Sequence, residues 1–276
     1  MAQVVYEKSR GLTDAPLTYC PGCTHGIIHK LIAESLVELG ALDKTIAIAP
    51  VGCSVLAYNF FNCDGVQASH GRAPAVATGI KRVLPDKIVF AYQGDGDLAS
   101  IGTAEIIHAA HRGENFTVIF VNNAIYGMTG GQMAPTTLIE QKTSTSPYGR
   151  KRATAGDPIK VSEMLATIPS AAYIERVSAH DAPHIMKAKK AIKKAFEYQI
   201  AGKGFSMVEV LAACPIGWNV PPVEAARFVA TDLMPYYPLG VYRDEPAGVS
   251  AEGCTIPLKN ACPWYLDGQK GKGGSK

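Results

Sequence analysis

The stretch "KIVFAYQGDGDLAS", residues 87–100, combines a buried strand with a turn that carries two acids. Its apolar start is typical of a strand covered on both faces, and the spacing from Gly94 to Ala99 matches the loose dinucleotide pattern G-x-G-x-x-A. Such a turn holds phosphate on backbone N–H groups at the start of a helix, where carboxylates would repel it. Asp95 and Asp97 therefore need a partner that attracts both carboxylate and phosphate oxygens.

The end of the next predicted strand supplies a second ligand for such a partner. The stretch "TVIFVNN", residues 117–123, ends in two asparagines where the dinucleotide pattern would place an acid for the ribose. A divalent cation resolves the conflict, because Mg²⁺ prefers hard oxygen ligands and carries phosphates with it. We interpret Asp95 and the amide oxygen of Asn123 as ligands of Mg²⁺, which in turn binds the phosphates.

Strand and helix patterns alternate along most of the chain. Amphipathic patterns predict helices over residues 27–39, 101–112 and 182–200, with Gly40 ending the first. This alternation predicts an α/β fold with a doubly wound parallel sheet and with ligands at the carboxyl ends of the strands. Nearly continuous apolar runs predict buried strands at residues 45–50, 87–92, 117–121, 172–177 and 206–211.

Two segments depart from this alternation. Residues 129–156 are rich in Gly, Thr, Ser and Pro, and a loop of that length is typically functional or disordered. After about residue 215 the chain becomes Pro-rich and then ends in GQKGKGGSK. We therefore expect a binding domain over residues 1–220, followed by a C-terminal arm and a flexible basic tail over residues 221–276.

The composition excludes several classes of protein. The 276 residues carry a formal charge of only +3, without the basic stripe that nucleic-acid binding requires. No apolar run approaches the ~18 residues of a membrane-spanning helix, and the N-terminal stretch lacks a signal-peptide pattern. We expect a cytoplasmic protein with neither a nucleic-acid nor a membrane partner.

Seven cysteines in a chain expected in the cytoplasm favour metal binding or catalysis over disulfides. The pair Cys20-x-x-Cys23 alone fits zinc, iron–sulfur or a redox dithiol. Cys53 and Cys214 each follow a predicted strand, so they are expected at the sheet edge that carries the acids. One pair with two distant single cysteines favours a [4Fe–4S] cluster over structural zinc, which stays the alternative. Cys63, Cys254 and Cys262 show no ligand spacing and are interpreted as ordinary thiols.

Other ionisable residues have ordinary explanations in the sequence. His25 and His29 are expected to be structural. The lysine run at residues 187–194 is expected to be a solvated helix face, with a docking face for an acidic electron-transfer partner as the alternative.

The motifs CPGC, VGCS, HGRA, GDGD, NN and CPIG follow one another over residues 15–220. In this order they resemble the thiamine diphosphate-binding β subunit of the 2-oxoacid:ferredoxin oxidoreductases, most closely the 2-oxoisovalerate type. The resemblance implies the thiamine diphosphate-binding fold, with thiamine diphosphate, Mg²⁺ and a [4Fe–4S] cluster as cofactors. The implied Mg²⁺ ligands are Asp95, Asn123 and the carbonyl of Ile125, and the implied cluster ligands are Cys20, Cys23, Cys53 and Cys214. The implied cofactor contacts are Gly52, Cys53, Ser54, His70, Gly71, Arg72, Gly96, Asp97, Gly127 and Met128, with His70 and Arg72 also as candidate catalytic residues.

The resemblance also implies an activity and partners. The reaction is the oxidative decarboxylation of a 2-oxoacid with coenzyme A to acyl-CoA and CO₂, with electrons passing through the cluster to ferredoxin. An α subunit would supply the glutamate against the aminopyrimidine ring of the cofactor, and γ and ferredoxin-like δ subunits are expected as further partners. The chain is therefore expected to act as one subunit of an enzyme.

The segment after the third cysteine bears on the substrate. Members of the family that use 2-oxoglutarate can carry a Lys or Arg there, but residues 53–61 read CSVLAYNFF. This favours a branched-chain 2-oxoacid such as 2-oxoisovalerate, with 2-oxoglutarate or pyruvate as alternatives. Two other classes stay open, namely a non-oxidative thiamine-dependent decarboxylase subunit and a zinc-stabilised binding protein.

Overall fold

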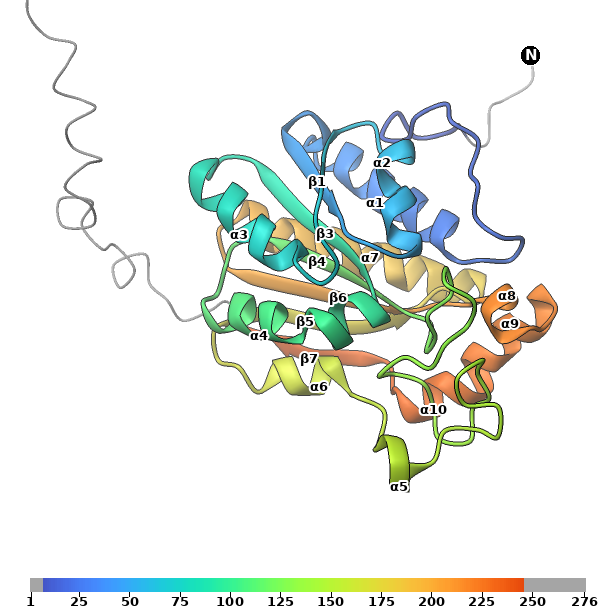
Figure 1. Cartoon of the computed structure of the whole chain (residues 1–276). Helices are drawn as coiled ribbons and strands as arrows, with labels where there is room; N and C mark the ends of the chain where they lie inside the picture. The colour runs from blue at the N-terminus through green and yellow to red at the C-terminus, as the bar shows by residue number, and fades with distance from the viewer. Residues whose placement is uncertain (1–6, 246–276) are drawn as a thin grey trace, which may run out of the picture.

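A seven-stranded β-sheet organises the chain in the computed structural model, which describes residues 7–245 (Figure 1). The strand order is β2-β1-β3-β4-β6-β5-β7, and every neighbouring pair is parallel except β5 and β7. The predicted α/β fold with a parallel sheet is thereby confirmed, with one antiparallel strand added at its edge. The strands are β1 (Thr45–Ala49), β2 (Asp64–Gln67), β3 (Ile88–Gly94), β4 (Thr117–Asn122), β5 (Ala171–Ser178), β6 (Phe205–Leu211) and β7 (Gly240–Asp244).

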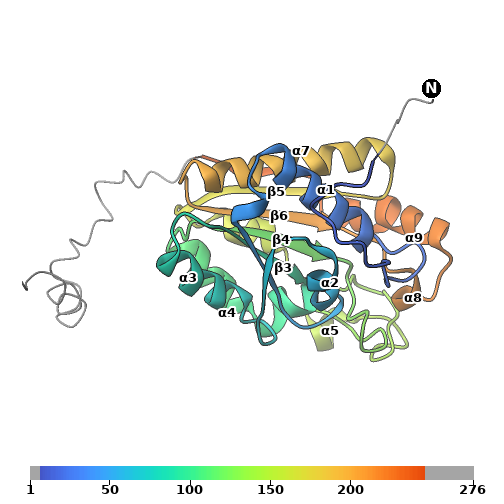
Figure 2. The same cartoon turned by 90° about the horizontal axis from the view of Figure 1, so that it is seen from above.

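Helices cover both faces of the sheet, as Figure 2 shows from above. Helices α1 (His25–Glu38) and α7 (Ala182–Ile200) cover one face, and α3 (Ala73–Val83), α4 (Thr103–His111) and α6 (Val161–Ala166) cover the other. None of the helices within residues 7–245 is both long and apolar enough to span a membrane. The shorter helical segments are η1 (Leu42–Lys44), η2 (Cys53–Leu56), α2 (Ala57–Phe60), η3 (Asp97–Ile101), α5 (Arg152–Ala155), α8 (Pro215–Trp218), α9 (Pro222–Phe228), η4 (Val229–Leu233) and α10 (Met234–Tyr236).

Alternate residues of the central strands supply two separate cores. On β3, Phe90 and Tyr92 point to the core beneath α1 and α7, whereas Val89 and Ala91 point to the opposite core. All four side chains are fully buried, which explains why the strand is apolar throughout rather than alternating.

The two long helices on the first face are also joined by charges. Lys189 of α7 pairs with Glu34 and Glu38 of α1, at 2.8 and 2.7 Å, and Lys193 pairs with Glu38 at 2.9 Å. Lys194 pairs with Asp244 on β7 at 2.5 Å. Much of the predicted lysine face is thus occupied by contacts within the chain.

The described part of the predicted C-terminal arm packs against the sheet. Val229, Leu233 and Tyr237 are fully buried with Leu211 at the end of β6, and β7 then pairs with β5. The domain boundary at residue 220 stays a prediction. The predicted flexible tail, Cys254 and Cys262 lie outside the described residues.

Candidate functional site

Three neighbouring strands, β1, β3 and β4, bring most of the predicted site residues to one cavity at their carboxyl ends. The cavity has a volume of about 130 Å³. Ligands in parallel sheets are typically bound at this edge. The predicted residues that line the cavity are Gly52, Cys53, Ser54, His70, Asp95, Gly96, Asp97, Asn123, Ile125, Gly127 and Met128.

Asp95 is a buried carboxyl in the turn after β3, with 2% of its surface exposed. Its Oδ1 accepts a hydrogen bond from the backbone N–H of Gly96 at 2.8 Å, and its Oδ2 accepts one from the Thr136 hydroxyl at 2.5 Å. Burial raises the pKa of Asp95 to about 6, although these hydrogen bonds favour the anion. A cation would compensate the buried negative charge, so this carboxylate suits a divalent metal.

The two asparagines at the end of β4 have different surroundings. Asn122 is fully buried and donates its side-chain N–H to Glu209 at 2.8 Å, so it belongs to the core. Asn123 lines the cavity, and its side-chain oxygen accepts the backbone N–H of Ile125 at 3.3 Å. Directly after Asn123, Ala124 adopts the left-handed backbone conformation with φ 55°. Of the two asparagines, only the second therefore lines the cavity.

Asp97 is the acceptor for three groups at the back of the cavity. Its Oδ1 accepts the backbone N–H of Gly71 at 2.7 Å and is 2.5 Å from Nδ1 of His70. Its Oδ2 accepts the side-chain N–H of Gln93 at 2.6 Å. Because Nδ1 of His70 is engaged by Asp97, Nε2 is the ring nitrogen available to a ligand in the cavity.

Arg72 and Gly71 do not line the cavity. The guanidinium of Arg72 forms an ion pair with Glu105 on α4 and donates to the carbonyl of Ile101 at 3.3 Å. Gly71 takes part through its backbone contact with Asp97. The structure thus brings His70 to the cavity and directs Arg72 to α4.

Two positions in the motifs require glycine because neighbouring side chains leave no room for a Cβ atom. A Cβ atom on Gly96 would lie 2.0 Å from the ring of Tyr126, whose hydroxyl donates to the carbonyl of Gly96 at 3.0 Å. A Cβ atom on Gly127 would lie 3.0 Å from the sulfur of Cys214 and 3.9 Å from that of Cys53. The lack of a side chain at Gly127 therefore leaves room for two predicted cluster ligands, one of which, Cys53, also lines the cavity.

The four predicted cluster cysteines come from three distant segments and act on one another electrostatically. Burial, together with a smaller effect of the charge of Cys53, raises the pKa of Cys23 to about 11 and that of Cys214 to about 12. Burial raises the pKa of Cys53, and the charge of the exposed Cys20 adds to this shift. Cys63, in contrast, has Ala47 and Asp64 as the neighbours that affect its pKa, so it lies apart from the set.

Several residues at the site were not predicted from the sequence. His25 lines the cavity, stacks on Tyr19 and lies 2.5 Å from the hydroxyl of Tyr92. The Tyr19 hydroxyl donates to the carbonyl of Cys53 at 3.1 Å. Thr136, which contacts Asp95, comes from the long polar loop. The HGRA and GDGD motifs gave no signal for these contacts, because each depends on residues distant in the sequence.

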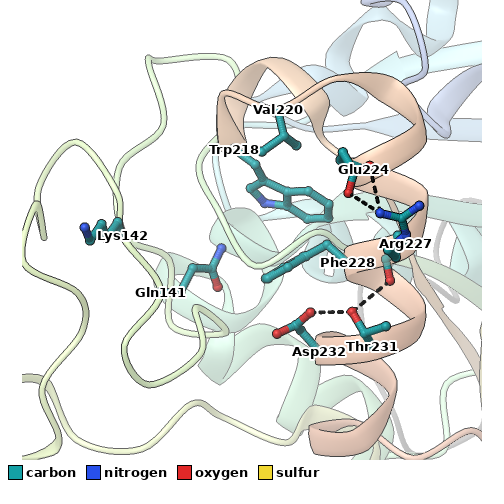
Figure 3. A pocket seen from close by; sticks show the side chains of 9 residues that line it. All are labelled: Gln141, Lys142, Trp218, Val220, Glu224, Arg227, Phe228, Thr231 and Asp232. Atoms are coloured by element: carbon teal, nitrogen blue, oxygen red, sulfur yellow. Dashed lines mark hydrogen bonds and ion pairs between the residues drawn. The ribbon is translucent and has the colours of Figure 1, made fainter.

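A larger cavity of about 360 Å³ lies behind the turn that follows β4 (Figure 3). The rings of Trp218 and Phe228 form its wall, with centroids 4.8 Å apart. The indole N–H of Trp218 donates to the carbonyl of Asn123 at 3.0 Å, and Gln141 donates to that of Ala124 at 3.4 Å. None of the predicted site residues lines this cavity. Its lining residues Trp218 and Gln141 instead hold the turn after β4 in place from the side opposite the site.

A second group of possible metal ligands consists of His180, Asp181 and His184 at the start of α7. Asp181 is the N-cap of this helix, and its Oδ1 accepts the backbone N–H of His184 at 2.9 Å and is 2.6 Å from the Nδ1 atom of the same residue. The two imidazole rings contact each other in a tilted arrangement, with centroids 4.4 Å apart. Helix capping and the contact between the rings account for this group without a metal.

Comparison with known proteins agrees with this geometry. Residues 50–210 match the family "Thiamine pyrophosphate enzyme, C-terminal TPP binding domain". A solved structure of a 2-oxoglutarate:ferredoxin oxidoreductase from Magnetococcus marinus, with 2-oxoglutarate, coenzyme A and succinyl-CoA bound, superposes with a TM-score of 0.70 at 27% identity. The match covers 87% of this chain and 85% of that one.

Two curated relatives are more similar in sequence. Ketoisovalerate oxidoreductase subunit VorA of Methanothermobacter thermautotrophicus is 49% identical over 243 residues, which cover 88% of this chain and 51% of the relative. The chain thus spans about half the length of this relative. 2-Oxoglutarate synthase subunit KorB of Archaeoglobus fulgidus is 37% identical over 212 residues, covering 77% of this chain and 75% of the relative. The resemblance seen in the sequence is confirmed, and the chain belongs to the thiamine diphosphate-binding subunits of the 2-oxoacid:ferredoxin oxidoreductase family.

Proposed function

We propose that this chain is the β-type subunit of an enzyme that oxidatively decarboxylates a branched-chain 2-oxoacid, with coenzyme A, to acyl-CoA and CO₂. Electrons would leave through a [4Fe–4S] cluster to ferredoxin. The observation that carries the proposal is the composition of the cavity at the ends of β1, β3 and β4. Its lining contains Asp95 and Asp97 and, among the residues that the structure describes, no lysine or arginine.

This composition supports a metal-bridged diphosphate. A diphosphate placed beside two carboxylates with no basic side chain needs a cation between them. Asp95, Asn123 and the carbonyl of Ile125 would hold Mg²⁺, and Gly96, Asp97, Gly127 and Met128 would lie along the diphosphate. Gly52 and Ser54 at the end of β1 would contact the cofactor, and the buried Ser54 hydroxyl lacks a hydrogen-bond partner within the described chain. When bound, thiamine diphosphate stabilises the carbanion that remains when CO₂ leaves a 2-oxoacid.

The cysteine geometry supports a cluster over the zinc alternative. Zinc–sulfur bonds of about 2.3 Å hold the sulfurs of a tetrahedral site roughly 3.8 Å apart. Among the described residues 7–245, no three of the four sulfurs of Cys20, Cys23, Cys53 and Cys214 lie within 4.8 Å of one another. A spacing wider than that of a tetrahedral zinc site favours a [4Fe–4S] cluster, which these thiolates would hold next to Gly127 and beside the cavity that Cys53 also lines.

Within the cavity, His70 is the candidate for contact with the reacting groups. Asp97 orients its ring and leaves Nε2 facing the cavity, where it could exchange a hydrogen bond or a proton with the substrate. Arg72 could take part only after leaving its ion pair with Glu105.

The apolar surroundings of the cavity support a branched-chain substrate. Val51 and Met128 line it and are 38% and 47% exposed, so both can contact a ligand side chain. The segment 53–61 contributes no cation to meet a second carboxylate. A 2-oxoglutarate substrate is the second candidate, because relatives such as the Archaeoglobus protein are named for that substrate.

The size of the cavity supports a shared active site. At about 130 Å³ it is smaller than the roughly 300–1,000 Å³ typical of small-molecule sites. The rest of the cofactor would lie against an α subunit, which would supply the glutamate for its aminopyrimidine ring. We also propose γ and ferredoxin-like δ subunits as partners, and a cytoplasmic location.

Anaerobic reconstitution tests this function. The chain, with thiamine diphosphate, Mg²⁺, coenzyme A and an electron acceptor, is assayed on 2-oxoisovalerate, 2-oxoglutarate and pyruvate, with and without an α subunit. We expect a brown iron-containing protein that turns over only with the partner and has its highest kcat/KM on 2-oxoisovalerate. CO₂ release without reduction of the acceptor would indicate a non-oxidative decarboxylase, and a colourless protein with stoichiometric zinc would refute the cluster.

A further inference from the structure

Two adjacent threonines of the 129–156 loop contact both halves of the proposed Mg²⁺ site. Thr136 donates its hydroxyl to Oδ2 of Asp95 at 2.5 Å. Thr137 donates its hydroxyl to the carbonyl of Ala124 at 2.7 Å, between the other two proposed ligands. Both threonines are fully buried, so their hydroxyls have no competing water contacts. One turn of the loop therefore joins the strand end of β3 to that of β4.

Two long side chains hold this turn by its carbonyl groups. The hydroxyl of Tyr237, in the C-terminal segment, donates to the carbonyl of Thr136 at 2.7 Å. The guanidinium of Arg150 donates to the carbonyl of Thr137 at 2.8 Å. Tyr237 is fully buried and Arg150 is 4% exposed.

Arg150 also connects the two ends of the loop. On one side it donates to the carbonyls of Ala134 and Pro135, at 3.3 and 2.9 Å, besides that of Thr137. On the other side it donates to the carbonyls of residues 155, 156 and 157, at 2.8, 3.0 and 3.1 Å. A planar guanidinium can serve several carbonyls at once because its donors spread in a fixed fork. The loop is thus folded around one side chain.

We propose that Thr136 is a positioning residue for Mg²⁺ binding: it orients the Asp95 carboxylate, and Arg150 and Tyr237 hold it in place. This rests on the proposed function, because it assumes that Asp95 is a ligand of Mg²⁺. Partners that orient a metal ligand through a hydrogen bond typically alter metal affinity by about 10- to 100-fold when removed.

The test is titration of the full chain with Mg²⁺ in the presence of thiamine diphosphate, by calorimetry, with the thermal midpoint of each metal-free variant measured separately. Thr136→Val removes the hydroxyl and keeps the shape, and we expect a loss of Mg²⁺ affinity of about tenfold or more. Thr136→Ser keeps the hydroxyl and should restore binding. Arg150→Lys replaces the planar fork and should weaken binding as Thr136→Val does.

Thr117→Val is the matched control. Thr117 is also a fully buried threonine, and its hydroxyl accepts from Gln199 at 2.8 Å, at the opposite end of β4. We expect this variant to lose thermal stability without losing Mg²⁺ affinity. If Thr136→Val does not fold, Tyr237→Phe removes only the hydroxyl that holds Thr136 and is expected to weaken Mg²⁺ binding.

The outcomes separate this inference from the proposed function. Wild-type affinity for Mg²⁺ in a folded Thr136→Val variant, or in Tyr237→Phe where the former does not fold, overturns the inference and leaves the proposed function standing. An equal loss of affinity in Thr136→Ser and Thr136→Val also overturns it, since the hydroxyl would then be irrelevant. Absence of Mg²⁺-dependent cofactor binding in the wild-type chain, both alone and with an α subunit, overturns the proposed function itself.

Discussion

The Glu209→Gln substitution perturbs a buried ionic network next to the site. Glu209 and Arg176 are fully buried on neighbouring strands, with Oε2 of the carboxylate 2.8 Å from Nε of the guanidinium. Oε2 also accepts the hydroxyl of Ser162 at 2.5 Å, and Oε1 accepts the side-chain N–H of Asn122 at 2.8 Å. A glutamine has the same volume but only one acceptor oxygen, so its NH₂ must face another donor.

The substitution leaves Arg176 with one carboxylate, that of Glu163 at 2.5 Å. Removing one partner of a buried ion pair costs about 3–5 kcal/mol where the remaining charge is left uncompensated, and the lower end of this range applies here because Glu163 still compensates part of the charge of Arg176. We expect the free energy of unfolding to fall by about this amount.

Urea denaturation of the full chain measures the effect, read as a shift of the midpoint at unchanged slope. The matched control is Glu140→Gln. Glu140 pairs with Lys151 at 2.7 Å but is 65% exposed, and such surface pairs contribute only about 0–1 kcal/mol. A loss below about 1 kcal/mol for Glu209→Gln would refute the reasoning, because the buried pair would then behave as an exposed one.

Three further predictions concern the metal sites and the pH dependence of stability. Asp95→Asn should abolish Mg²⁺-dependent binding of thiamine diphosphate without changing the iron content, because it removes the anionic ligand and keeps the volume; wild-type binding in a titration would reject Asp95 as a ligand. Cys53→Ser should lose cluster iron and Cys63→Ser should retain it, since only the former sulfur lies near other predicted ligands; equal iron content in the two variants would contradict the assignment. Burial tends to raise the pKa of Glu163, but the hydrogen bonds and charge of Arg176 outweigh it and lower the pKa below its usual 4.5. The ion pair therefore stabilises the fold fully above pH 4.5, and this stabilisation is lost as the pH falls through the lowered pKa. The urea midpoint of Glu163→Gln should consequently change less with pH than that of the wild type in this acidic range. Identical pH profiles of the two midpoints would contradict a stabilising role of this ion pair.

The strands at the centre of the sheet and the residues at their ends could be predicted from the sequence. All five predicted strands are present, since strands buried on both faces require continuous apolar runs that are visible locally. Gly40 follows α1 and has φ 62°, a left-handed conformation that favours glycine at the end of a helix. This helix end depends only on local backbone geometry, so it could be predicted from the sequence. The acids of GDGD and the asparagines at the end of β4 were expected together, because carboxyl ends of neighbouring parallel strands share one edge.

The edge strands and the contacts around the site were decided by the tertiary structure. Strand β2 is exposed at each of its residues and β7 is exposed or half-buried, so neither shows the apolar run of a central strand. Asn123 was predicted to lie at the site, but the sequence did not reveal that Asn122 binds Glu209 in the core. It also did not reveal that Thr136 bonds to Asp95 across 41 positions of the chain. Periodicity reports which face of an element is buried, whereas a hydrogen bond between distant segments depends on how folded loops meet, and no local pattern encodes that.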